Sequence, residues 1–179
     1  MVLAYQEYYT LEDYQHWEGD WELIKGMPYA MAPSPSVTHQ TISGNFLSQI
    51  KSNTQNKHKT CDHCYVLMET DWQISNDTIV RPDVMVICKE IDEKVLVTPE
   101  LIIEVVSSSS TKRDESMKFK LYQQEGVLYY ILAYPEKQVA KVYFNTSNGY
   151  RKMSDYIKES VEFTINDCHF HIDFSKIWR

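Results

Sequence analysis

Two short apolar runs, each carrying one acidic residue, most constrain how this chain can fold. Residues 82–88 (PDVMVIC) and 101–106 (LIIEVV) have the length and the β-branched content of buried strands. Turn-forming residues flank both runs, at positions 76–77 and 107–110. An ionised carboxylate that is isolated from water is costly, so Asp83 and Glu104 each require a partner.

Two kinds of partner can satisfy these acids. In a purely structural arrangement, Asp83 caps a turn or pairs with Arg81, and Glu104 pairs with a lysine; buried pairs of this kind are common. Alternatively, the two carboxylates converge on one divalent cation, Mg²⁺ or Mn²⁺, because these hard cations prefer oxygen ligands. The second interpretation predicts a metal-dependent hydrolase.

A helical pattern follows the second run. Residues 111–122 start after a serine-rich segment that supplies a cap, and acids lie in the first turn. Asp114, Lys118 and Tyr122 are four residues apart and therefore share one stripe of the helix. The short connection brings this stripe close to the end of the Glu104 strand. Two carboxylates and a lysine are the minimum set for hydrolysis of a phosphodiester.

The charge of the chain gives opposing indications. The net charge is -7, and six acids precede the first Lys or Arg, which argues against nucleic-acid binding. Basic residues nevertheless cluster beside the predicted site (Lys112, Arg113, Lys118 and Lys120) and in a second patch (Lys51, Lys57, His58 and Lys59). A basic rim around an acidic site is one interpretation, and a solvated helix face is the other.

Length and composition indicate one domain, residues 1–179, with a sizeable core, since 43% of the residues are hydrophobic. No run approaches the ~20 apolar residues of a membrane span, and the N-terminus does not resemble a secretory signal. We therefore expect a cytoplasmic protein whose four cysteines are reduced, with Cys88 as a core residue.

The segment 61–64 (CDHC) raises a third possibility, a structural zinc site completed by Cys168, His169 or His171. No second cysteine pair follows at the spacing of a zinc finger or ribbon. Ordinary core or surface cysteines are therefore the favoured interpretation.

Other patterns predict the remaining elements. Helices are expected at 9–17 and 38–51, and two strands within 21–31 are expected to meet at a Lys25-Gly26 turn. Strands 65–74 and 79–88 are expected to form a hairpin around residues 76–77. Strand 128–132 should lie parallel to the Glu104 strand in a β-α-β unit. Residues 139–144 suggest an edge-like strand, and Ile177-Trp178 are expected to dock onto the body.

Taken in order, these segments resemble the Uma-two family of restriction-endonuclease-like proteins, a branch of the PD-(D/E)XK nuclease superfamily. The resemblance covers almost the whole chain. It is carried by residues 21–26 (WELIKG), 31–36 (MAPSPS) with His39-Gln40, 81–86 (RPDVMV), 99–107 (PELIIEVVS), 112–114 (KRD), Lys118, Tyr122, and 172–174 (IDF) near Ile177-Trp178.

The resemblance implies an α/β fold, a restriction-endonuclease-like mixed β-sheet flanked by α-helices. It also implies a metal-dependent endonuclease in which Asp83 and Glu104 bind Mg²⁺ or Mn²⁺ and Glu22 is an additional site carboxylate, which completes the metal shell or orients a second water. The signature lysine, two positions after the glutamate, would fall at Val106; in this family the following helix supplies it, and Lys118 matches that position. Lys118 is then expected to position the attacking water and to offset charge on the phosphorane.

We expect the substrate to be a nucleic acid, DNA in particular, contacted by His39, Lys112, Arg113 and Tyr122. A catalytically inactive nuclease-like binding or scaffolding module is the alternative, because a fold does not by itself establish chemistry. An enzyme that cuts both strands of a duplex needs two sites, so we expect a homodimer, with residues 128–144 as its interface.

Overall fold

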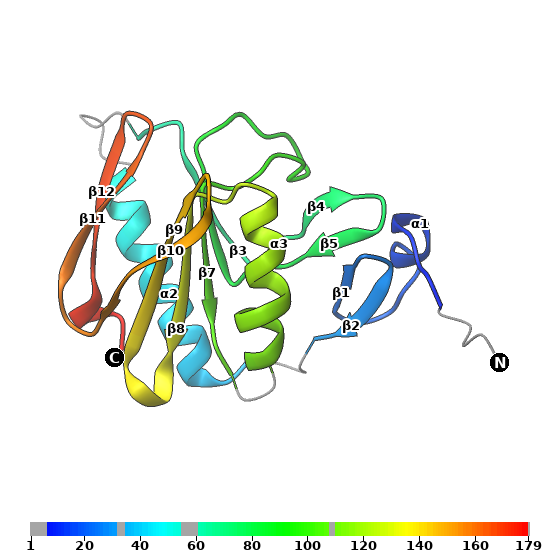
Figure 1. The fold of residues 1–179 in the computed structure, drawn as a ribbon, viewed down its shortest axis with the longest axis horizontal. Coiled ribbons are helices and arrows are strands. Elements are labelled where there is room, and N and C mark those ends of the chain that lie inside the picture. The colour runs from blue at the N-terminus through cyan, green and yellow to red at the C-terminus, as the bar shows by residue number, and fades with distance from the viewer. Residues whose placement is uncertain (1–6, 32–34, 55–60, 108–109, 179) are drawn as a thin grey trace.

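The computed structural model describes residues 7–31, 35–54, 61–107 and 110–178. Its centre is a six-stranded mixed sheet with the order β10-β9-β8-β7-β6-β3 (Figure 1). The strands are β3 (Tyr65–Met68), β6 (Val84–Ile87), β7 (Leu101–Val105), β8 (Tyr129–Tyr134), β9 (Val139–Thr146) and β10 (Gly149–Tyr156). Strands β7 and β8 are parallel and the other neighbours are antiparallel, which confirms the predicted β-α-β unit.

Both faces of this sheet are covered at its centre, which explains why β6, β7 and β8 are almost continuously buried. Helix α2 (Val37–Thr54) packs on one face, where Ile42, Phe46 and Ile50 meet alternate side chains of β6 and β7. The other face packs against the helical segment that consists of η1 (Arg113–Lys118), a π-helix, and α3 (Phe119–Gln124). The expected mixed sheet flanked by helices is confirmed.

A smaller sheet with the order β2-β1-β5-β4 lies beside the larger one (Figure 1). It consists of β1 (Trp21–Ile24), β2 (Met27–Ala30), β4 (Trp72–Ser75) and β5 (Thr78–Val80), and the short helix α1 (Leu11–Tyr14) precedes it. The predicted turn between β1 and β2 is present: Lys25 and Gly26 have φ angles of 52° and 75°. A side chain at Gly26 would also collide with the ring of Tyr8, whose Cδ2 lies 2.2 Å from an ideal Cβ position.

The expected long hairpin around residues 76–77 is divided between the two sheets. Strands β4 and β5 belong to the smaller sheet, whereas β3 and β6 belong to the larger one. Both strands of the hairpin are interrupted where the chain passes from one sheet to the other. On one strand Glu69 has a positive φ of 45°, and on the other Pro82 has no N–H for a ladder hydrogen bond. This interruption places Asp83 at the junction of the sheets, immediately before β6.

The C-terminal residues form a separate two-stranded sheet, β11 (Ser160–Ile165) and β12 (Cys168–Asp173), with 3-10 helices at Pro135–Lys137 (η2) and Phe174–Lys176 (η3). Gln49 of α2 exchanges two hydrogen bonds with the backbone of Asp173. Ile177 is fully buried, so the predicted docking of the C-terminus is confirmed.

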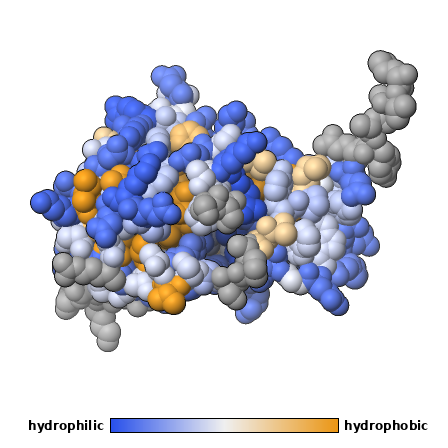
Figure 2. Space-filling model, turned by 90° about the horizontal axis from the view of Figure 1, so that it is seen from below, coloured by the Kyte–Doolittle hydropathy of each residue, from blue (hydrophilic) through white to orange (hydrophobic). Residues whose placement is uncertain are grey.

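One expectation for residues 128–144 is wrong: strand β9 is not an edge strand, because β10 pairs along its outer side. Nearly all side chains of β8 are buried, whereas most side chains of β9 are partly exposed. The expected dimer interface at these residues stays a prediction. Figure 2, the view from below, shows strongly apolar atoms on the side of the larger sheet and a mainly hydrophilic surface beside the smaller sheet. No helix among the described residues is long and apolar enough to cross a membrane.

The four cysteines form two disulfides, Cys61–Cys168 and Cys64–Cys88, whereas reduced thiols were expected. The tertiary fold brings together cysteines that are 107 and 24 residues apart in sequence. The zinc site completed by a β12 histidine is also wrong: His169 and His171 are exposed, while Cys168 is buried, because alternate residues of a strand face opposite sides.

Candidate active site

The two acids of the apolar strands lie on the same face of the larger sheet. Val84 is paired with Ile103 in the antiparallel β6–β7 ladder, so the next residues along this register, Asp83 and Glu104, are opposite each other. Asp83 is oriented by two donors to Oδ2: the N–H of Val105 at 2.6 Å and His39 Nε2 at 3.1 Å. The predicted convergence of the two carboxylates therefore follows from strand register.

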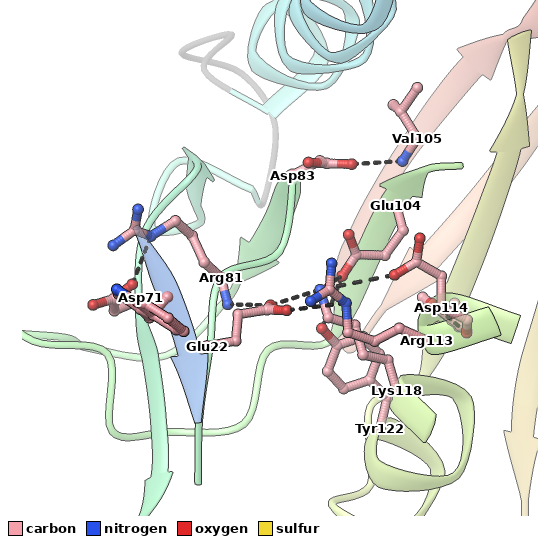
Figure 3. A network of polar contacts seen from close by, with 12 residues as sticks. Glu22, Asp71, Arg81, Asp83, Glu104, Val105, Arg113, Asp114, Lys118 and Tyr122 are labelled. Carbon is pink, nitrogen blue, oxygen red and sulfur yellow. Dashed lines mark hydrogen bonds and ion pairs between the residues drawn. The ribbon is translucent and has the colours of Figure 1, made fainter. Parts of the chain in front are cut away.

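Lys118 occupies the centre of the site (Figure 3). Its Nζ lies 2.7 Å from Glu22 Oε1, 2.9 Å from Glu104 Oε1 and 3.9 Å from Asp114 Oδ1. The predicted stripe is present, although residues 113–118 are π-helical rather than α-helical. Such π-helical turns occur frequently at functional sites, and here Asp114 and Lys118 are both buried within one.

Glu22 reaches the site from β1 of the smaller sheet. Its Oε1 accepts the N–H of Arg81 at 2.9 Å as well as the ammonium of Lys118. Its Oε2 is buried without a hydrogen-bond partner among the described residues, and Arg113 Nε lies 3.5 Å away. Lys118 lies between Glu22 and Glu104, so Glu22 is a partner of the lysine. The expected role of Glu22 as a third metal ligand stays a prediction.

Tyr122 is fully buried, so the expectation that it contacts substrate is wrong. Its hydroxyl donates to Glu104 Oε1 at 2.8 Å, on the same oxygen that Lys118 contacts. Both contacts fix the orientation of the Glu104 carboxylate. Tyr122 is therefore a positioning residue for Glu104.

The structural pairings considered from the sequence are present only in part. Glu104 does pair with a lysine, Lys118. Asp83 does not pair with Arg81, whose guanidinium contacts Asp71 at 2.7 Å and Asp20 at 2.6 Å. The Arg81 backbone matters for the site in a different way, through the N–H that holds Glu22.

The site carries more negative than positive charge. Five carboxylates (Glu22, Glu69, Asp83, Glu104 and Asp114) and three permanent cations (Arg81, Arg113 and Lys118) line the pocket, and His39 contributes a further positive charge when protonated. Burial raises the pKa of Glu104 well above its ordinary value, and although Lys118 opposes this, neighbouring carboxylates add to it. Burial likewise raises the pKa of Asp114 to about 6. For both acids burial is the largest cause, and neighbouring carboxylates add to it.

Contacts with site carboxylates favour the charged forms of Lys118 and His39. Burial alone would lower the pKa of Lys118, but Glu104, Glu22 and Asp114 raise it above the ordinary value of a lysine. Burial also opposes protonation of His39, yet the contact with Asp83 outweighs it and raises the pKa of His39. Lys118 is therefore a charged hydrogen-bond donor in this site.

These side chains line a pocket with a volume of about 260 Å³. Its lining includes His39 and Arg113, two of the predicted substrate contacts, together with Glu22, Asp83, Glu104 and Lys118. Lys112 is exposed beside the pocket and Lys120 is exposed further along the helix. Residues 57–59 of the second basic patch lie outside the described residues.

The donor set fits a hard divalent cation. Both contacts to Glu104 fall on Oε1 and both contacts to Asp83 fall on Oδ2, so no described residue donates to the second oxygen of either acid. A magnesium ion is commonly bound by one or two carboxylates, with waters and substrate phosphate completing its shell. Asp83 and Glu104 match that requirement, and the excess negative charge favours a dication.

The sequence predicted that Asp114 shares a helical stripe with Lys118, but it did not predict that Asp114 is one of the site carboxylates. It is 2% exposed and lies in the pocket lining. Its spacing of four residues from Lys118 was the available signal. The spacing alone did not distinguish a buried acid from a solvated first-turn acid that favours the helix N-terminus.

Comparisons with known proteins agree with this geometry. Residues 5–167 match the Uma2 family, described as putative restriction endonuclease. The fold is similar to a crystal structure of a putative nuclease belonging to DUF820 from Anabaena variabilis ATCC 29413, with a TM-score of 0.74 and 17% sequence identity, covering 95% of this chain and 97% of that chain. No curated protein matches the sequence. The expected restriction-endonuclease-like fold is thus confirmed.

Proposed function

This chain belongs to the Uma2 family of putative restriction endonucleases, and from that premise we propose that it is a Mg²⁺- or Mn²⁺-dependent endonuclease that hydrolyses phosphodiester bonds in DNA. One observation carries the proposal: a buried lysine is surrounded by Glu22, Glu104 and Asp114, beside Asp83, in an open pocket with excess negative charge. A purely structural ion pair has no need of three carboxylates around one lysine with a fourth carboxylate beside them.

Asp83 and Glu104 would hold the metal, since each has one carboxylate oxygen that no described residue contacts. When bound, Mg²⁺ or Mn²⁺ supplies Lewis-acid polarisation of the scissile phosphate and lowers the pKa of a coordinated water. His39 and the Val105 N–H fix Asp83, while Tyr122 and Lys118 fix Glu104. The ligands are thus oriented by the protein before metal arrives.

Lys118 supplies a fixed positive charge next to the metal ligands. As an ammonium group it donates hydrogen bonds to the attacking water and to the phosphorane oxygens, where negative charge develops in the transition state. Glu22, held by the Arg81 N–H, keeps the lysine in place. Arg113, which lines the pocket, and the exposed Lys112 would contact neighbouring phosphates.

The decisive experiment compares native protein with Asp83→Asn on single-stranded DNA, duplex DNA and RNA, each with Mg²⁺, Mn²⁺ or chelator. We expect native cleavage that requires metal, with DNA preferred, and no cleavage by the variant. Glu90→Gln, an exposed substitution, is the matched loss of a carboxylate and should cleave normally. Equal cleavage by native protein and Asp83→Asn would remove Asp83 from the mechanism.

Calorimetry with Mn²⁺ separates the enzyme from an inactive module. If Asp83→Asn loses both Mn²⁺ binding and cleavage, the result supports a metal-dependent enzyme. A native protein that neither binds Mn²⁺ nor cleaves would instead favour the nuclease-like scaffolding module.

We further propose a homodimer for cleavage of both duplex strands, because one small domain carries one site. Light scattering at micromolar concentration should report twice the 21.1 kDa chain mass. A monomer that still cuts both strands of a duplex would exclude this arrangement.

A further inference from the structure

The four cysteines lie at the end of β6 that is remote from the carboxylates. Asp83 precedes this strand and Cys88 follows it. In Figure 1 the chain that enters β3 passes beside the β11–β12 turn at the top of the view. Here Cys61 meets Cys168, which we call the inner pair, and Cys64 meets Cys88, which we call the outer pair. The proposed nuclease chemistry uses none of these residues.

The backbone, and not the sulfur–sulfur bond, brings the outer pair together. Tyr65 is paired with Ile87 in the antiparallel β3–β6 ladder, so the adjoining residues Cys64 and Cys88 are opposite each other. Their Cα atoms are 4.1 Å apart, close to the ~4.5 Å typical of directly opposed residues in a non-hydrogen-bonded pair. The two sulfurs would therefore remain neighbours after reduction.

A third ligand group adjoins the outer pair. A ligand nitrogen of His63 and the sulfurs of Cys64 and Cys88 all lie within 4.8 Å of one another. Two sulfur ligands of a tetrahedral Zn²⁺ are about 3.8 Å apart, given zinc–sulfur bonds of about 2.3 Å. Small side-chain rotations are enough to reach that geometry. In the described part of the chain, no other group of three His, Cys, Asp or Glu ligand atoms is as closely spaced.

The inner and outer pairs differ in access to solvent. Cys61 and Cys168 are both 0% exposed, whereas Cys64 and Cys88 are 6% and 7% exposed. The His63 side chain is 54% exposed, and the Asp62 carboxylate lies 3.8 Å from its Nδ1. Reductants and metal ions therefore reach the outer pair first, and Asp62 adds negative charge beside it.

We propose that His63, Cys64 and Cys88 bind one Zn²⁺ when the outer disulfide is reduced, with water in the fourth position. Two molecules of a thiol reductant break the disulfide, are oxidised to one disulfide themselves, and leave two protein thiols. Binding of Zn²⁺ then releases the two thiol protons, since thiolate is the ligand. Two thiolates and an imidazole are ligands that suit zinc.

Metal binding to the whole chain tests this proposal independently of any nuclease activity. The protein is either reduced with a phosphine or oxidised with a disulfide such as oxidised glutathione, and then titrated with Co²⁺ and with Zn²⁺. Charge-transfer absorption from thiolate to Co²⁺ reports sulfur ligands only, so binding at Asp83 and Glu104 does not contribute. We expect one equivalent of metal with this absorption in the reduced protein and none in the oxidised protein.

Matched variants identify the ligands. His63→Ala should weaken Zn²⁺ binding by about tenfold or more, since even residues that only orient a ligand contribute that much. His171→Ala, an equally exposed histidine at 53%, should bind like native protein. Cys64→Ser should lose the charge-transfer absorption, whereas Cys168→Ser should retain it.

Two results would overturn the proposal. One is reduced native protein that takes up less than about a tenth of an equivalent of Zn²⁺. The other is a set of variants that contradicts the assigned ligands: either His63→Ala binds Zn²⁺ with native affinity, or the charge-transfer absorption persists in Cys64→Ser and disappears in Cys168→Ser. Because His63 lies at the surface, its variant remains informative even if a cysteine variant does not fold.

Discussion

Replacing Asp114 by asparagine should stabilise the metal-free protein, and only above the pH at which Asp114 ionises. Its folded-state pKa of about 6, raised chiefly by burial, exceeds the ordinary aspartate pKa of 3.8. One pKa unit corresponds to about 1.4 kcal/mol, so a shift of about two units corresponds to about 3 kcal/mol. Because the folded state binds the proton more tightly, native stability falls as the pH rises from about 4 to about 6.

Asparagine does not titrate and keeps nearly the same shape. The gain in unfolding free energy for Asp114→Asn should therefore be close to zero below pH 4 and should approach about 3 kcal/mol above pH 6. Loss of the Asp114 charge also removes one of the contributions that raise the pKa of Glu104, which changes stability in the same direction.

Urea unfolding in the presence of chelator, at several pH values between 4 and 8, measures this difference. Glu90→Gln, an exposed change of the same chemical kind, should show no comparable pH-dependent gain. The reasoning about excess negative charge would be refuted if the gain from Asp114→Asn were the same at all pH values, or if the variant were less stable at pH 8.

Four further outcomes are expected. Glu104→Gln should abolish metal-dependent cleavage while circular dichroism shows an intact fold. Lys118→Ala should lower turnover by about two orders of magnitude in single-turnover assays. The same variant should lower the unfolding free energy by about 3–5 kcal/mol, because it leaves buried carboxylates unpaired. Native stability in this variant would contradict the central position of Lys118. Tyr122→Phe should cost about 1–3 kcal/mol through the lost hydrogen bond to Glu104, with a thermal shift as the measurement. Removal of divalent metal by chelator should stop cleavage and lower the melting temperature, since a ligand that binds only the folded state stabilises it.

Much of the site was determined by local sequence. The apolar runs around Asp83 and Glu104 predicted two buried strands, and the spacing of Asp114, Lys118 and Tyr122 predicted that one helical stripe would face them. These predictions succeeded because strand alternation and helical periodicity depend only on neighbours along the chain. The parallel β7–β8 pair was likewise predictable, since a strand-helix-strand connection has few possible arrangements.

Only the tertiary structure decided the roles within the site. Whether Glu22 binds metal or holds Lys118 depends on where the smaller sheet meets the larger one, and the buried position of Tyr122 depends on how α3 packs against β8. The division of the hairpin at Glu69 and Pro82, and the pairing of Cys61 with Cys168 across 107 residues, are likewise long-range outcomes. Sequence periodicity determines which face of an element is apolar, whereas the partner of a buried charge or thiol is determined by contacts between segments that are distant in the chain.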